Sequence, residues 1–167
     1  RCNILQHSSQ GVVLKTQPPE GGDQEIFEVV ILDGVWLCCR KELWKLLKFD
    51  ETYEGFHFYD LDFSMSAFVL GLHNYVTHQV LIEHFSAGHM DMKWIEAASK
   101  FHDKWKSHLP AQIGILKGRE RRRIKREALK NLLNTLSLNG YNDHLAWFKN
   151  WINFWVTSPL KREAYSI

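Results

Sequence analysis

Two carboxylates separated by one residue, Asp60 and Asp62, stand at the start of an expected helix in the segment 55–71. The apolar residues of this segment recur at helical spacing and should face a core: Leu61, Met65, Phe68 and Leu72. Carboxylates in a first helical turn are favoured by unpaired amides and by the helix dipole, so helix capping is the simplest interpretation. Catalysis is the alternative, because a histidine and three aromatic side chains also gather ahead of this helix.

Two further groups could take part in chemistry. The dipeptide Asp33-Gly34 lies between the apolar runs 25–32 and 35–39, and two strands joined by a tight turn are the preferred interpretation. The alternative is a ligand pocket, since glycine lets a ligand approach the backbone closely. His84 ends the alternating segment 75–84, which predicts a strand followed by a loop of small residues.

The remaining elements should position these groups in an α/β domain. A short strand is expected over 11–14, a helix over 41–47, and a helix capped by Asp91 that runs to about residue 109. We therefore expect a small mixed sheet, with strands near residues 12, 28, 37 and 79, covered by helices that follow Asp60 and Asp91.

The chain changes character after Pro110. Eight Lys or Arg residues lie between 117 and 130, and leucines at helical spacing follow them, which predicts a basic amphipathic helix. A Trp-rich helix over about 143–156 should complete a helical pair. This pair could contact an anionic membrane surface, but packing on the domain or on a second copy is the preferred interpretation.

The composition limits the size of the core, the possible partners and the redox environment of the protein. A chain of 167 residues with 45% hydrophobic residues can form one substantial core, and a net charge of +2 is too mild to argue for nucleic acid. Three cysteines make neither a disulfide framework nor a zinc pattern, which favours a reducing cytoplasm. The sequence begins at Arg1 without a methionine, so we expect the later part of a longer protein or a chain shortened by processing or design.

The order of these motifs resembles one known family. It resembles the C-terminal, acceptor-binding half of family 2 type glycosyltransferases with the GT-A fold, particularly the streptomycin-biosynthesis-like branch. The segments that carry this resemblance are, in order, Leu32–Arg40, Phe49–Glu51, Gly55–Asp60 and His84. The resemblance covers roughly residues 25–109. It implies a partial GT-A-like mixed sheet in residues 1–110, with residues 111–167 as a basic and Trp-rich helical extension.

The resemblance also implies roles for individual residues. Asp60 takes the position of the catalytic base, which accepts the proton of an acceptor hydroxyl as that oxygen attacks the anomeric carbon of a nucleotide sugar. Tyr59 stands where the family usually has Glu, and Asp62 is assigned to capping and orientation. Acceptor-binding positions are implied for five residues: Asp33, Gly34, Trp36, His57 and Tyr59. His84 matches a histidine near the metal, for which Mn²⁺ or Mg²⁺ is implied.

One part of the family pattern is missing. Such enzymes bind the nucleotide through an N-terminal βαβ half that ends in an Asp-x-Asp metal motif, and this sequence contains no such half before residue 25. We therefore expect an inverting glycosyltransferase or its catalytic half, with a nucleotide sugar and a hydroxyl acceptor as partners. The alternative is a non-enzymatic, truncated transferase-like module for binding or oligomerisation. Nucleic-acid binding is disfavoured, because the basic run lacks interleaved aromatics.

Overall fold

The computed structural model describes residues 3–16, 25–86, 91–115 and 117–138. The chain divides into two compact units, residues 1–113 and 114–167. The described residues form a mixed α/β structure with four helices, a three-stranded mixed sheet and a two-stranded antiparallel sheet. None of the helices in this described part has the length and apolar content needed to span a bilayer.

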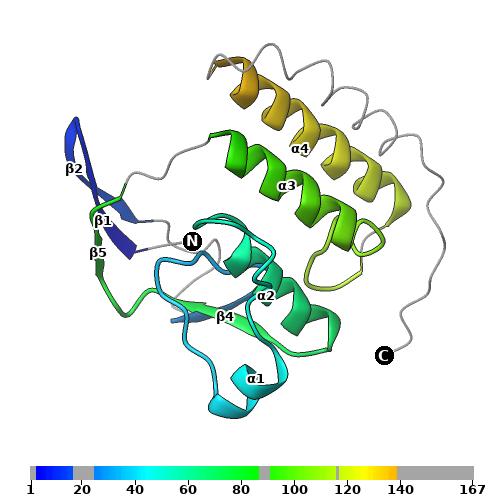
Figure 1. Ribbon diagram of the computed structural model, residues 1–167, viewed down its shortest axis with the longest axis horizontal. Helices are drawn as coiled ribbons and strands as arrows, with labels where there is room; N and C mark the ends of the chain where they lie inside the picture. Colours follow the sequence, from blue (N-terminus) through cyan, green and yellow to red (C-terminus); the bar gives the residue numbers. More distant parts are fainter. Residues whose placement is uncertain (1–2, 17–24, 87–90, 116, 139–167) are drawn as a thin grey trace. The chain divides into compact units, whose positions relative to one another are not determined.

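The three-stranded sheet has the order β2-β1-β5 (Figure 1). Strands β1 (Asn3–Ser8) and β2 (Gly11–Thr16) form an antiparallel hairpin, and β5 (Ile82–His84) pairs in parallel with β1. The strand predicted over 11–14 is therefore confirmed as part of β2, but β1 was not predicted. Strand β1 alternates too weakly between apolar and polar residues to indicate a strand by itself.

The second sheet pairs β3 (Ile26–Val29) with β4 (Asn74–Thr77). The prediction of one strand over 75–84 is wrong, because a turn over 78–80 divides it and its two ends join different sheets. The Thr77 hydroxyl helps to form this turn by accepting a hydrogen bond of 3.2 Å from the Gln79 amide. The strand predicted over 35–39 is also wrong, since the described residues 31–40 form loop and turn.

Three helices complete the first unit: α1 (Lys41–Leu46), α2 (Tyr59–Val69) and α3 (Met92–Trp105). The predicted caps of the last two are confirmed. Gly71, with φ of 75°, ends α2 by donating to the Phe68 carbonyl while Leu72 donates to Ala67. The Asp91 side chain accepts the Trp94 amide at 2.9 Å and begins α3.

The core of this unit lies between α2 and α3, which run side by side in Figure 1. Met65 from α2 is fully buried and packs with Ala97, Phe101 and Trp105 from α3 and with Tyr53 from the preceding loop. Burial of these large side chains supplies the main stabilisation of the pair. Of the other residues predicted to face the core, Leu61 is partly buried against this cluster, Phe68 is half-buried and Leu72 is exposed.

The described part of the second unit is dominated by the helix α4 (Gly118–Leu138), which confirms the predicted basic amphipathic helix. Its leucine Leu136 is fully buried. The helix predicted over 143–156 lies outside the described residues.

Candidate functional site

The site begins where the backbone turns into α2. Phe58, the residue before the helix, adopts a left-handed conformation with φ of 64°, which is unfavourable for a residue with a side chain. Its ring is held by Trp94 and Phe101 of α3, with ring centroids 5.2 and 5.5 Å away. Aromatic packing thus offsets the backbone strain and fixes the direction in which Tyr59 and Asp60 leave the turn.

Asp60 is a buried carboxylate that backbone amides hold in place. Its Oδ2 accepts a hydrogen bond of 2.6 Å from the Gly34 amide, and its Oδ1 accepts one of 2.9 Å from the Leu61 amide. Burial raises the pKa of Asp60, the amides of Leu61, Gly34 and Asp60 itself lower it, and the charge of Asp33 raises it further. The two carboxylate oxygens have about four lone-pair sites in total, more than these three amides use, so one can still accept a proton.

Two buried polar residues hold the segment 30–34 along α2. The Ser64 hydroxyl donates to the Asp60 carbonyl at 2.8 Å and accepts from the Leu32 amide at 3.1 Å. The Asn74 side chain donates to the carbonyls of Val30 and Ser64 at 2.8 and 2.9 Å. These side chains satisfy backbone groups that a strand ladder would otherwise use, which explains why the predicted 25–39 hairpin stops at β3.

Gly34 fits against α2 because it has no side chain. A β-carbon at this position would collide with the Tyr59 hydroxyl and lie 2.9 Å from Oδ2 of Asp60. The Tyr59 hydroxyl itself donates to the Gly34 carbonyl at 3.4 Å. Burial, followed by the charges of Asp60 and Asp33, raises the pKa of Tyr59, so this phenol stays protonated as a donor.

We predict that Gly34→Ala separates the 30–34 segment from Asp60. The methyl group cannot fit without moving Tyr59 or the loop, so the Gly34 amide should lose its contact with Oδ2. Overpacking of this kind costs about 1–3 kcal/mol in the free energy of unfolding, which urea denaturation measures. Gly118→Ala, at the first residue of α4, is the control for an added methyl group, since nothing lies within 4 Å of its β-carbon and its φ is not positive. Equal losses in both variants would contradict a specific close approach at Gly34.

The structure brings together four of the seven predicted site residues: Asp33, Gly34, Tyr59 and Asp60. Asp33 is exposed, and its Oδ1 accepts the Val35 amide at 3.2 Å, which shapes the loop. The hairpin interpretation of Asp33-Gly34 is wrong, because the dipeptide lies in a loop against Asp60, and the ligand-pocket interpretation stays a prediction.

The other three predicted residues lie apart from this group. Trp36 is 55% exposed and lies two residues beyond Gly34. His57 is partly buried, with its Nε2 3.5 Å from the Asp91 carboxylate at the start of α3. His84 lies at the end of β5, in the other sheet, where its Nδ1 is 3.0 Å from the Gln6 side chain.

Asp62 does not cap the helix, contrary to its sequence assignment. Its side chain is 2% exposed and accepts hydrogen bonds from Tyr53 at 3.3 Å, from Lys104 at 2.8 Å and from Trp105 at 2.8 Å. The reason is geometric: residues two apart on a helix point about 200° apart, so Asp62 faces α3 while Asp60 faces the Asp33-Gly34 loop. For the same reason the nearby charge that raises the pKa of Asp60 belongs to Asp33.

A divalent cation finds no donor set in the described ranges. No three His, Cys, Asp or Glu side chains there converge on one point. His84 therefore does not form a metal centre with other described residues, and its assignment as a ligand stays a prediction that needs donors from elsewhere.

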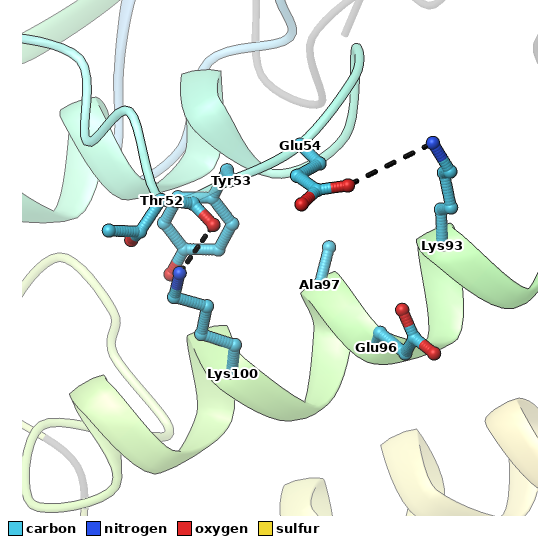
Figure 2. Close-up of a pocket in the computed structure, with 7 residues that line it drawn as sticks. All are labelled: Thr52, Tyr53, Glu54, Lys93, Glu96, Ala97 and Lys100. Atoms are coloured by element: carbon cyan, nitrogen blue, oxygen red, sulfur yellow. Dashed lines mark hydrogen bonds and ion pairs between the residues drawn. The ribbon is translucent and has the colours of Figure 1, made fainter.

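A separate pocket lies between the loop 52–54 and the first half of α3 (Figure 2). Its charged side chains are largely paired: Lys93 is 3.9 Å from Glu54, and the Lys100 ammonium donates to the Thr52 carbonyl and lies over the Tyr53 ring. None of the residues around Asp60 lines it. This pocket is thus distinct from the candidate site.

No known protein family, curated protein or solved structure matches this chain.

Proposed function

We propose that this chain is the catalytic, acceptor-binding half of an inverting glycosyltransferase, with Asp60 as the general base. The observation that carries the proposal is the environment of Asp60: a buried carboxylate with a raised pKa, positioned by the Gly34 amide beside Asp33 and Tyr59. A general base works best when its pKa is brought toward the working pH, and burial moves Asp60 in that direction.

The proposed reaction is a single displacement. The acceptor oxygen forms a bond to the anomeric carbon of the nucleotide sugar, and the bond from that carbon to the diphosphate oxygen breaks with its electron pair. The hydroxyl proton passes to Asp60, so the anomeric configuration inverts. The exposed carboxylate of Asp33 can accept hydrogen bonds from other acceptor hydroxyls, and the exposed Trp36 ring offers a flat apolar face to sugar C–H groups. His57 lies apart from Asp60, so we assign it to a more distant part of the acceptor.

We assign the binding of the nucleotide sugar to a part of the enzyme outside residues 1–167. A GT-A fold would supply the nucleotide-binding half and the cation motif there, and no step of the proposed proton transfer runs through a metal. We place the enzyme in the cytoplasm, where nucleotide sugars are made and where the exposed thiols of Cys38 and Cys39 would stay reduced.

Transfer assays with the full-length protein test the function directly. We expect release of nucleoside diphosphate from at least one member of a panel of nucleotide sugars, with Mn²⁺ and a mixture of hydroxyl acceptors. The glycoside produced should have the opposite anomeric configuration to the donor, as NMR would show. Retention of configuration would contradict a single displacement, and absence of turnover with every donor would favour the second candidate below.

A second candidate, an oligomerisation module, is favoured by strand β2. This strand lies at the outer edge of its sheet, and Val12, Val13 and Leu14 are each more than half exposed. Unpaired strand edges with apolar side chains are prone to pair with another chain. Antiparallel pairing of β2 with β2 of a second copy would make a homodimer, which is compatible with either candidate.

We predict that Val13→Lys converts such a dimer to a monomer, because a charged side chain on an edge strand opposes pairing. Size-exclusion chromatography with light scattering measures the mass. Leu46→Lys on α1 is the matched control, since Leu46 is also exposed, at 68%, but lies outside the sheet. A wild-type protein that stays monomeric at high concentration would contradict the pairing.

A further inference from the structure

The positive charge of this protein is concentrated in one helix. Helix α4 contains seven Lys or Arg residues and two Glu, a net charge of +5, within a chain whose net charge is +2. The rest of the chain therefore has 14 basic and 17 acidic residues, a net charge of −3. Helix α4 is thus strongly basic although the net charge of the whole chain is small.

Five of these basic residues form a stripe, which we call the basic stripe: Arg119, Arg122, Arg123, Arg126 and Lys130. At about 100° per residue they fall within an arc of about 100° on one side of α4, over a length of roughly 16 Å. All five are exposed. The stripe differs from the triplet Arg121-Arg122-Arg123 that stands out in the sequence, because Arg121 lies about 200° away from Arg119 and is half-buried.

The two halves of α4 have different surroundings. The leucines beyond the stripe are withdrawn from water: Leu132 and Leu133 are half-buried and Leu136 is fully buried. The first three turns instead leave the basic stripe open to water. Packing of the C-terminal turns can thus hold the helix in place while the stripe stays available to a partner.

We propose that the basic stripe docks on the anionic surface of a lipid bilayer. Its side chains are long and lie on one side of the helix, an arrangement that suits a flat surface of negative charge. The acidic residues of the helix, Glu120 and Glu127, lie about 80–100° from Arg119, just beyond the edge of the stripe. A plane that touches the stripe leaves both glutamates outside the contact.

A nucleic acid fits this arrangement less well. A groove encloses a helix and brings phosphates to both of its flanks, so Glu120 and Glu127 would face a phosphate backbone along one flank. The stripe also contains no aromatic residue on which a base could stack. The charge pattern of α4 therefore favours an anionic lipid surface as the partner of the basic stripe. This proposal does not depend on the role proposed for Asp60.

Vesicle sedimentation with the full chain tests this proposal. The wild type should bind vesicles of phosphatidylserine and phosphatidylcholine, bind phosphatidylcholine alone far more weakly, and lose binding as salt is raised. The variant R122Q/R123Q/R126Q should bind roughly a hundredfold more weakly, since each basic residue near an anionic surface contributes on the order of a fivefold factor. R122K/R123K/R126K keeps the charge and should bind within a few-fold of the wild type.

A matched control removes the same charge elsewhere. K41Q/K45Q/K106Q replaces three exposed lysines outside α4 and should leave vesicle binding nearly unchanged. Circular dichroism should show the same helix content in all variants. The proposal is overturned if the Gln variant of the stripe binds as the wild type does, if the control variant loses as much, or if the protein binds double-stranded nucleic acid through these arginines and leaves anionic vesicles in solution.

Discussion

Asp60→Asn should reduce glycosyl transfer by about 10²–10⁴-fold, the usual contribution of a general base. Asparagine has nearly the same shape, and its amide oxygen can still accept the Gly34 hydrogen bond that Oδ2 of Asp60 accepts at 2.6 Å. It cannot take up the acceptor proton. The loss should therefore appear in kcat, measured as product formed per enzyme at saturating donor and acceptor, with an unchanged urea transition as proof of folding.

The pH profile gives a second readout for Asp60. The base must be ionised, and burial raises its pKa above the ordinary aspartate value. The rate should thus fall as pH drops through this raised pKa, at a higher pH than an exposed aspartate would give, and Asp60→Asn should abolish that limb. Asp103→Asn, at an exposed position on α3, is the control that should keep both rate and profile. Transfer that is unchanged in Asp60→Asn would remove Asp60 from the mechanism.

Asp62→Ala should lower the free energy of unfolding by roughly 3 kcal/mol. The substitution leaves the Tyr53 hydroxyl and the Trp105 indole N–H without their buried acceptor, and each such loss costs about 1–3 kcal/mol. Lys104 is partly exposed and also contacts Asp50 at 2.9 Å, so water and that second carboxylate limit its share of the cost. Urea denaturation measures the difference.

Two further variants separate the causes of this loss. Asp62→Asn keeps an oxygen for the Trp105 indole but places an uncharged amide near Lys104, so we expect a smaller loss than for Ala. Asp103→Ala removes an exposed carboxylate from α3 and should change stability by less than 0.5 kcal/mol. An Asp62→Ala protein as stable as the wild type would show that the buried contacts of Asp62 are not needed.

Local signals predicted the helices of the first unit well. The cap at Asp91, the left-handed Gly71 and the apolar spacing along α3 act over a few residues, so their outcome could be anticipated from the sequence. The same holds for the basic helix α4, although the sequence alone does not show that Arg121 is half-buried while the basic stripe is exposed.

Long-range contacts decided what the sequence could not predict. Ser64 and Asn74 hold residues 30–34 on α2, and this contact replaced the expected hairpin after Asp33-Gly34. The sequence assigns Asp62 to the helix cap, because its actual partners, Tyr53, Lys104 and Trp105, all lie outside α2 and only tertiary packing brings them to it. A carboxylate and a serine inside an otherwise apolar helical stretch were the available signals of a buried polar network.

The parallel pairing of β1 with β5 has a consequence for how the chain acquires its structure. Gln6 and His84 are neighbours in this sheet although 78 positions separate them in sequence, while β1 and β2 are joined by a tight turn. Closing such a large loop is entropically costly, so the hairpin can form early and β5 should join it late. On the ribosome, the hairpin would emerge with one edge of β1 unpaired until β5 has left the exit tunnel. During this interval the unpaired edge of β1 is open to association with another chain.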